Sequence, residues 1–282
     1  MEILKVDGLC KKYTGFELKD VSFSLEKGYI MGFIGRNGAG KTTTLKSMMN
    51  LVHPDKGSVE MCGMDFASNE LECKKSVSFM LGGADYYSKK RLKTITDVVR
   101  RFYDEWDDDK YRELLKRFEL DENKRIEELS QGMTVKYGLA LAMSHNAKLL
   151  MLDEPTSGLD PVSRDDLLEL FQELIEDGER SILFSTHITS DLDKCADFIT
   201  YIKDGKIIAS TEKDTFVESY RVVRGTNETL TPEMQTMLIG IKKHAFGFNA
   251  LALAEDVASL GLESAKADVE TIMVHIESED LK

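Results

Sequence analysis

The chain has 282 residues, 42% of them hydrophobic and 31% charged, which is ordinary for a globular protein with one sizeable core. Fifty acidic and 37 basic residues give a net charge of −13, and this disfavours sequence-independent binding to nucleic acid. The four cysteines form no C-x-x-C pair, which argues against a metal site and a disulfide framework. No apolar run approaches the roughly 20 residues that a membrane-spanning helix needs, and the charged N-terminus is not a secretory signal. We therefore expect a cytoplasmic protein.

Short strand-like segments open the chain, at residues 3–6, 17–25 and 29–34. Residues 21–25 alternate apolar and polar side chains, as a half-buried strand does. The third segment is apolar nearly throughout, which is typical of a strand buried on both faces. A glycine-rich loop follows, and residues 41–52 are predicted to form a helix.

The middle of the chain changes to helical patterns, from about residue 88 to residue 143. Residues 134–145 are predicted to form one helix and residues 109–120 another. In the latter segment, apolar side chains recur at the spacing i, i+3, i+4 and i+7, which places them on one helix face. These side chains are Tyr111, Leu114, Leu115 and Phe118.

Two further strands, at residues 148–154 and 181–187, are separated by an acidic helix at 166–179. A strand–helix–strand alternation implies a parallel sheet. Beyond about Thr211 the pattern shifts again. Strands are predicted at 220–225, 237–253 and 269–276, with a helical segment at 254–261, and residues 211–282 are interpreted as a small α+β accessory unit.

The segment "GRNGAGKT", from Gly35 to Thr42, fits the pattern G-x-x-x-x-G-K-[ST]. Its glycines allow successive backbone N–H groups to point inward around a phosphate, and the N-terminus of the next helix adds further donors. Lys41 supplies a charge for the β- and γ-phosphates, and Thr42 offers a hydroxyl to Mg²⁺. A chance match arises in roughly one chain of this length in a hundred. Because this match also follows a strand and opens a helix, we predict nucleotide binding.

A carboxylate pair follows the apolar strand in "KLLMLDEP". Asp153 ends the strand, where it can hold Mg²⁺ through water, and Glu154 stands where a general base can orient the attacking water. The alternative is an acidic helix cap, which by itself would be as good an interpretation. The glycine loop upstream favours the catalytic one.

Two other sites have a structural alternative that the residues alone leave open. Ser130 is predicted to cap a helix, and Gly132 follows it at the helix head, where an anion can also bind. His187 comes just after the end of an apolar strand, on the side where α/β sheets bind ligands. A lone histidine at such a place is more often structural than catalytic.

With these residues in view, residues 1–210 resemble the ATPase subunit of ATP-binding-cassette (ABC) transporters. Five segments stand in the order of that family: "GRNGAGKTT" resembles Walker A, "LSQGM" the signature, "LLMLDE" Walker B, "SGLD" the D-loop, and His187 the switch histidine. The resemblance implies a P-loop NTPase core of α/β class with an N-terminal antiparallel β region and a helical subdomain at about 84–145. It implies contacts with ATP from Asn37, Gly38, Ala39, Gly40, Lys41, Thr42 and Thr43.

The resemblance also implies roles for single residues outside the glycine loop. Tyr13 stands where the family stacks an aromatic ring on adenine, with Phe16 as a rival and a packed surface tyrosine as the structural alternative. His187 is expected to hold the γ-phosphate. In this family two cassettes pair head to tail, so Ser130 and Gly132 are expected to contact the ATP of a partner cassette, either a second copy or a paralogue.

Two segments depart from the family pattern. The signature is "LSQGM" where the family commonly has "LSGGQ", but Ser130 and Gly132 are retained. At the Q-loop, where the family usually places a glutamine that touches Mg²⁺, Gly82 and Gly83 follow the strand "SVSFML". We therefore assign no metal ligand there.

The C-terminal segments resemble the tail of cassettes that serve bacterial exporters of antimicrobial or cytolytic peptides, of the phenol-soluble-modulin or YtrB-like type. We therefore expect an ATP-hydrolysing subunit that uses ATP and Mg²⁺, works on the inner face of the membrane through separate transmembrane subunits, and powers an exporter. The alternative is a soluble ATP-driven switch or a regulatory ATP-binding module. The acidic charge and the absence of a second cassette in the chain disfavour a switch on ribosomes or DNA.

Overall fold

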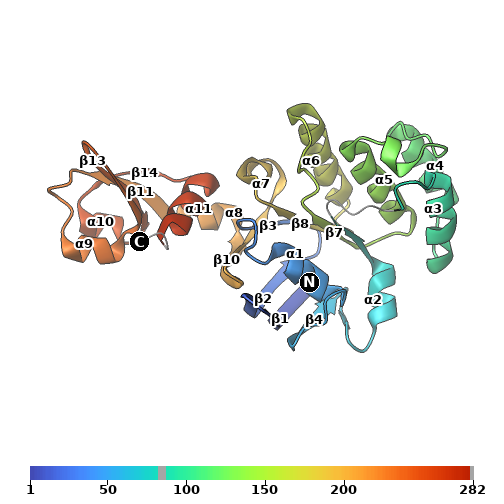
Figure 1. Cartoon of the computed structure of the whole chain (residues 1–282), viewed down its shortest axis with the longest axis horizontal. Helices are drawn as coiled ribbons and strands as arrows, with labels where there is room; N and C mark the ends of the chain where they lie inside the picture. Colours follow the sequence, from blue (N-terminus) through green and yellow to red (C-terminus); the bar gives the residue numbers. More distant parts are fainter. Residues whose placement is uncertain (82–86, 280–282) are drawn as a thin grey trace. The chain divides into compact units, whose positions relative to one another are not determined.

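The structure is a computed structural model that describes residues 1–81 and 87–279 (Figure 1). The chain forms two compact units, Met1–Ser210 and Thr211–Lys282. Each unit buries its own cluster of apolar side chains against its own β-structure. Among the described residues, no helix is both long enough and apolar enough to cross a membrane.

The first unit opens with an antiparallel sheet in the order β2-β1-β4-β5. In this sheet Leu4 pairs with Leu25 and Val6 pairs with Phe23. Buried and exposed residues alternate at the end of β2, which confirms the predicted half-buried strand. The strands are β1 (Glu2–Tyr13), β2 (Phe16–Glu26), β4 (Lys56–Met61) and β5 (Met64–Asp65).

The second sheet of this unit has six strands in the order β10-β9-β3-β8-β7-β6. Parallel ladders join β9, β3, β8, β7 and β6, and every residue of β3, β7 and β8 is buried. This confirms the parallel sheet expected from the alternation of apolar strands and helices. The strands are β3 (Ile30–Ile34), β6 (Val77–Met80), β7 (Leu149–Asp153), β8 (Ser181–Thr186), β9 (Phe198–Lys203) and β10 (Lys206–Glu212); the helices beside them are α1 (Lys41–Met48), α2 (Glu70–Ser76), α6 (Pro161–Ile175) and α7 (Thr189–Cys195).

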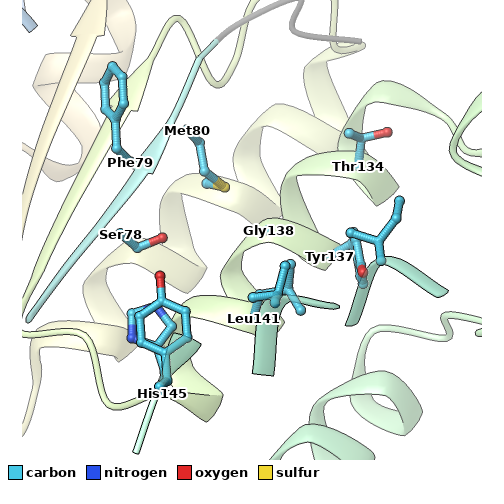
Figure 2. Close-up of a pocket in the computed structure, with 11 residues that line it drawn as sticks. Ser78, Phe79, Met80, Thr134, Tyr137, Gly138, Leu141 and His145 are labelled. Carbon is cyan, nitrogen blue, oxygen red and sulfur yellow. The ribbon is translucent and has the colours of Figure 1, made fainter. Parts of the chain in front are cut away.

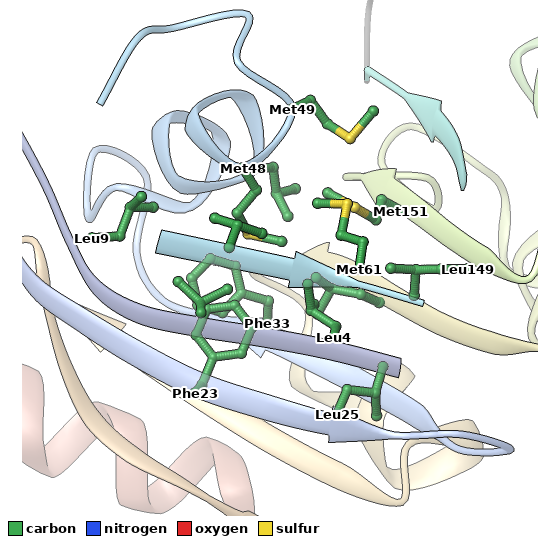
Figure 3. Packing of buried hydrophobic residues seen from close by; sticks show 14 of the residues in the cluster. Leu4, Leu9, Phe23, Leu25, Phe33, Met48, Met49, Met61, Leu149 and Met151 are labelled. Carbon is green, nitrogen blue, oxygen red and sulfur yellow. The ribbon is translucent and has the colours of Figure 1, made fainter. Parts of the chain in front are cut away.

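A continuous apolar core joins the two sheets (Figure 3). Phe23 of the antiparallel sheet stacks on Phe33 of the parallel sheet, with ring centroids 5.5 Å apart. Around this stack lie methionines from α1, β4 and β7, whose flexible thioether side chains fill irregular gaps. They include Met48, Met61 and Met151. The core fixes β3, and with it the loop after β3, against both sheets.

The described residues between β6 and β7 are mainly helical. The four side chains predicted to share one helix face, three on α4 and Phe118 directly after it, are buried, which confirms that prediction. Thr96 hydrogen-bonds to the hydroxyls of Tyr111 and Tyr137 at 2.7 and 2.8 Å, so one buried hydroxyl links three helices. The elements are α3 (Leu92–Val99), the 3₁₀ turn η1 (Arg100–Phe102), α4 (Asp108–Arg117), the 3₁₀ turn η2 (Ile126–Glu128) and α5 (Gln131–Ser144).

The second unit is a four-stranded antiparallel sheet in the order β12-β13-β11-β14, with its own small core. The long strand predicted at 237–253 is a hairpin in which His244 pairs with Gly247. The strands are β11 (Tyr220–Gly225), β12 (Ile239–His244), β13 (Gly247–Leu253) and β14 (Glu263–Lys266); the helices are α8 (Lys213–Glu218), α9 (Pro232–Met237), α10 (Val257–Leu260) and α11 (Val269–Ser278).

The strand predicted at residues 269–276 is wrong, because this segment forms the helix α11. Asp268 caps the helix by accepting a hydrogen bond from the backbone N–H of Thr271 at 2.7 Å. The β-branched residues suggested a strand, but the apolar positions follow the helical period of 3.6. The buried residues on this face include Val269, Ile272, Met273 and Ile276.

A cavity of about 160 Å³ lies between β6 and the helices α3 and α5 (Figure 2). Met80 reaches toward Gly138 across this cavity, and a methyl group added to Gly138 would lie 2.0 Å from the sulfur. His145 lines the same cavity and stacks on Tyr103, with ring centroids 3.8 Å apart. Burial lowers the pKa of His145 from 6.5 to about 4, because the charged imidazole would lose its hydration.

This lowered pKa predicts a loss of stability in mild acid. Between about pH 6.5 and pH 4 the unfolded chain binds a proton at His145 that the folded chain does not, so the free energy of unfolding falls as the pH falls. We expect a loss of roughly 2 kcal/mol between pH 8 and pH 5 from this residue. The measurement is urea denaturation of the wild type and of His145→Phe, which keeps the stack but cannot titrate. An equal pH dependence in both proteins would contradict the assignment.

Candidate functional site

The site lies where three parallel strands end. In the ladders, Ile34 of β3 pairs with Thr186 of β8, and Ser185 of β8 pairs with Asp153 of β7. The chain leaves all three strands at the same edge of the sheet. The glycine loop, the carboxylate pair and His187 therefore meet at this edge, although they are far apart in the sequence.

The glycine loop runs from the end of β3 into α1, which begins at Lys41. Gly40 has a φ of 116°, and a methyl group at this position would lie 2.8 Å from Leu18 and 2.9 Å from Phe16, so only glycine fits. The Nζ of Lys41 donates a hydrogen bond to the carbonyl oxygen of Gly35 at 2.7 Å. The lysine thus folds back over its own loop, and its side chain is almost entirely buried.

The other predicted residues of the loop divide by exposure. Ala39 and Gly40 are buried at the start of α1, where the four first N–H groups of the helix have no partner within it. Thr43 is half-buried on the first turn. Asn37 and Gly38 are exposed at the tip of the loop.

Oxygen atoms of three residues gather beside the start of α1. The hydroxyl of Thr42 lies 2.9 and 3.1 Å from the two carboxylate oxygens of Asp153. The hydroxyl of Ser185 donates to one of these oxygens at 2.7 Å. Hard oxygen ligands of this kind suit Mg²⁺, which commonly binds one or two carboxylate or hydroxyl oxygens together with phosphate and water. The residues present therefore fit the metal.

Ser185 was missed by sequence reasoning. Its hydroxyl holds Asp153 and also accepts a hydrogen bond from the backbone N–H of Glu154 at 3.0 Å. The available signal was a serine near the end of an apolar strand, which is too common to single out. Its value comes from the ladder that places it opposite Asp153.

Glu154 stands at the centre of the charged groups. One carboxylate oxygen lies 3.2 Å from the Nζ of Lys41, and the other lies 2.8 Å from the Nδ1 of His187. Glu154 has a φ of +50°, a left-handed conformation that costs of order 1 kcal/mol for a residue with a side chain. This backbone turn comes directly after the strand and is held by the hydrogen bond to Ser185. The structure therefore brings Lys41, Glu154 and His187 into one cluster.

The two aromatic residues near the glycine loop occupy different environments. Phe16 is half-buried against the apolar core, and its ring lies at the position where Gly40 would carry a side chain. Tyr13, at the end of β1, remains 42% exposed, and the Nζ of Lys11 lies 5.7 Å from its ring centroid. Of the two rings, Tyr13 is the more exposed.

Ser130 caps α5, as predicted, by accepting a hydrogen bond from the backbone N–H of Met133 at 3.2 Å. Among the described residues, its hydrogen bonds all lie within the first turn of this helix. Gln131, which departs from the family signature, lies against Gly158: a methyl group there would be 2.6 Å from the Gln131 side-chain oxygen. The helix head thus packs on the D-loop segment and not on the cluster around Glu154.

One expectation remains without a structural result. Gly82 and Gly83, which replace the expected Q-loop glutamine, lie outside the described residues. In the part of the chain that is described, no three or more histidine, cysteine, aspartate or glutamate side chains are grouped to bind a metal. The four cysteines are free in the structure.

Comparison with known proteins gives the family. Residues 18–157 match the sequence profile of the ABC transporter family. The ATP-binding protein YtrB of Bacillus subtilis is 33% identical over 203 residues, which cover 72% of this chain and 69% of YtrB. The bacitracin transport ATP-binding protein BcrA of Bacillus licheniformis is 30% identical over 209 residues, covering 73% of this chain and 68% of BcrA.

Solved structures agree with this result. An ATP-binding subunit of an ABC transporter is 27% identical and has a TM-score of 0.68, covering 76% of this chain and 91% of that one. A dimeric cassette bound to ADP and Pi shares the fold at 21% identity, with a TM-score of 0.65 and coverage of 74% and 98%. The chain therefore belongs to the ATP-binding subunits of ABC transporters, with the α/β ABC ATPase fold of enzymes that hydrolyse ATP to drive transport.

Proposed function

We propose that the cluster at the carboxyl ends of β3, β7 and β8 is the site of ATP hydrolysis in this chain. The observation that carries the proposal is the position of Glu154 between Lys41 and His187, at 3.2 and 2.8 Å. A base, a phosphate-binding cation and a switchable hydrogen-bonding group are the parts that γ-phosphate transfer to water needs.

In this proposal the glycine loop binds the phosphates of ATP. The N–H groups of residues 37–43 and the Nζ of Lys41 hold the β- and γ-phosphates, and Tyr13 stacks on the adenine. Thr42 and, through water, Asp153 hold Mg²⁺, which neutralises charge on the phosphates when bound. The carbonyl of Gly35 now accepts the bond from Lys41, and phosphate oxygens would replace it as the acceptor.

Glu154 and His187 share the chemical step. Glu154 accepts a proton from the attacking water and orients the lone pair of that water toward the γ-phosphate. His187 holds the γ-phosphate from the opposite side, and its hydrogen bond to Glu154 sets the direction of that carboxylate. The ion pair between Glu154 and Lys41 must loosen when Lys41 turns to phosphate, which leaves the carboxylate free to act as a base.

We further propose that two cassettes combine to complete each site. The chain contains one glycine loop and one signature segment. The hydrogen bonds of Ser130 stay within its own helix, so its hydroxyl and the N–H groups at the head of α5 are available to a γ-phosphate on a partner cassette. The partner is a second copy of this chain or a paralogue. Residues 1–210 would form the ATPase domain, with its helical subdomain at about 84–145, and 211–282 the accessory unit.

Replacing Lys41 with alanine is expected to weaken ATP binding by roughly tenfold to a hundredfold, because a buried charge-assisted hydrogen bond contributes about 1.5–3 kcal/mol. Isothermal titration calorimetry with ATP and Mg²⁺ measures the effect. Lys46→Ala, on the same helix but away from the loop, is the matched control and should bind ATP like the wild type. Unchanged affinity in Lys41→Ala would contradict the site assignment.

The oligomeric state of Glu154→Gln tests the composite site. This change keeps the shape of the side chain but removes the base, so ATP should be held and not hydrolysed. By light scattering we expect a monomer without nucleotide and a dimer with ATP and Mg²⁺. A double variant that adds Ser130→Arg should stay monomeric, because a bulky cation would obstruct the partner's phosphate. A Glu154→Gln chain that remains monomeric at saturating ATP would contradict a homodimer and point to a paralogous cassette.

For the cargo, we propose the export of peptides or antimicrobial compounds through separate transmembrane subunits on the inner face of the cell membrane. Support comes from the likeness to BcrA, whose name assigns it to bacitracin transport, and to YtrB. The alternative is a soluble ATP-driven switch or a regulatory ATP-binding module.

A deletion of the chain in its own host, complemented with the wild type or with Glu154→Gln, tests this proposal. We expect that the wild type restores resistance to cyclic and amphipathic peptide antibiotics by at least fourfold in inhibitory concentration, while Glu154→Gln does not. Fractionation of the tagged chain should place it with membranes. If the strains complemented with the wild type and with Glu154→Gln were equally susceptible and the chain fractionated with ribosomes, the soluble switch would be favoured.

A further inference from the structure

A buried carboxylate links two chain segments that carry residues of the ATP cluster, the name used here for Lys41, Glu154 and His187. Asp191, on α7, has no solvent exposure. Its Oδ2 accepts a hydrogen bond from the hydroxyl of Thr156 at 2.6 Å and lies 3.2 Å from the hydroxyl of Thr186. Both threonines are also fully buried. One carboxylate oxygen therefore joins two buried hydroxyl groups that come from different parts of the chain.

The positions of the two threonines give this contact its significance. Thr156 lies two residues after Glu154, at the start of the segment that leads into the D-loop. Thr186 is the last residue of β8, directly before His187. Its hydroxyl also accepts a hydrogen bond from the backbone N–H of Ile188 at 2.9 Å, so it fixes the chain on both sides of His187. Asp191 thus connects the backbone that carries Glu154 with the backbone that carries His187.

A third segment reaches the same carboxylate. Arg164, on α6 just after the D-loop, has its Nε 3.9 Å from the Oδ1 of Asp191. Within the described part of the chain, neither this nitrogen nor this oxygen has a hydrogen-bond partner. The two atoms face each other across a distance that a shift of about 1 Å in α6 would reduce to a hydrogen bond. Arg164 therefore adds the D-loop helix to the same connection.

An uncharged acceptor could accept hydrogen bonds from the two hydroxyls, and its burial would cost less desolvation free energy than that of a carboxylate. Burial and, to a smaller extent, the negative charge of Glu154 raise the pKa of Asp191, while the hydroxyls of Thr156 and Thr186 and the charge of Arg164 act in the opposite direction. A carboxylate without solvent is favourable only where donors and a cation face it. The charge is explained if Asp191 has to hold Arg164 as well as the two threonines.

We propose that Asp191 is a positioning residue for hydrolysis, which holds Glu154, His187 and the D-loop helix in one fixed arrangement. The inference rests on the roles proposed above for Glu154 and His187. Among the described residues, the hydrogen bonds and the ion pair of the Asp191 carboxylate go to Thr156, Thr186 and Arg164 and not to the glycine loop, so we expect Asp191 to act on the chemical step and not on the binding of ATP. A displacement of catalytic groups by 1 Å can lower a rate by about a hundredfold.

The test uses the full chain and removes the hydroxyls one at a time. Thr156→Val and Thr186→Val keep the side-chain volume. Thr156→Val deletes the hydrogen bond to Asp191, whereas Thr186→Val deletes the contact with Asp191 and also the acceptor for the backbone N–H of Ile188. We expect each to lower kcat by about tenfold to a hundredfold, with KM and the affinity for ATP changed less than about threefold. The double variant should lose less than the product of the single effects, because both hydroxyls act through one carboxylate.

The matched control is Thr200→Val, which deletes a fully buried hydroxyl on β9 that bonds to Ser210 and Met31, away from the ATP cluster. Because it also removes a fully buried, hydrogen-bonded hydroxyl, we expect a comparable loss of stability and a kcat within about twofold of the wild type. Asp191→Asn keeps an acceptor for the threonines but loses the charge, so it should retain more activity than Asp191→Ala if the hydroxyl links matter most.

Two results would overturn the inference. One is a kcat for Thr156→Val and Thr186→Val as high as that of Thr200→Val. The other is an equal loss of ATP affinity and kcat, which would indicate a general disturbance of the fold. Glu154→Gln, measured in the same assay, tests the proposed function separately from the role of Asp191. An active Glu154→Gln chain would contradict the role of Glu154 as the base, whatever the threonine variants do.

Discussion

The alignment of β3, β8 and β7 is the constraint on which the site depends. These parallel strands are paired residue by residue and buried along their whole length, so a shift in register would expose apolar residues or leave backbone groups without partners. The fixed register places Ser185 opposite Asp153 and brings the loop after each strand to one edge. Every polar contact of the ATP cluster begins from this alignment.

The apolar core also fixes the position of β3 in the parallel sheet. Phe23 and Phe33 stack between the two sheets, and β3 carries Phe33 one residue before its end. Phe16 and Leu18 of the antiparallel sheet reach the glycine loop itself at Gly40. The N-terminal sheet therefore does more than bury area, because it packs against the glycine loop at Gly40 and leaves Tyr13 exposed at the end of β1.

Polar contacts then connect the catalytic edge to the helices. Asp191 reaches the backbone next to Glu154, the backbone next to His187 and the arginine of α6. Asp160 caps α6 at the end of the D-loop, and its hydrogen bonds to Ser163 lower the pKa of its carboxyl group. Gln131 contacts Gly158 of the same loop. The D-loop segment thus contacts the head of α5 at one point and is linked through Asp191 to the end of β8 at another.

Much of the fold and most of the candidate site could be predicted from the residues, because the signals are local. The glycine loop, the apolar strand before Asp153 and the serine before α5 each specify their own backbone by spacing and chemistry. The strand predicted at 269–276 failed because β-branched residues suit both elements, and only packing on the sheet of its unit selects the helix. The sequence did not predict the roles of four buried polar residues, because their hydrogen-bond partners are distant in the sequence. These residues are Thr156, Ser185, Thr186 and Asp191.

The sequence by itself determined which residues form the glycine loop that we propose to bind phosphate, which carboxylates follow the strand and that the chain joins a parallel sheet to a helical region. Short-range spacing is enough for this, since a loop of glycines before a helix binds an anion wherever it stands. Only the tertiary structure decided that Glu154 lies between Lys41 and His187, that Phe16 packs on the core while Tyr13 stays exposed, and that Asp191 joins three segments. The reason is that these distances depend on strand register and core packing, which are properties of the whole chain.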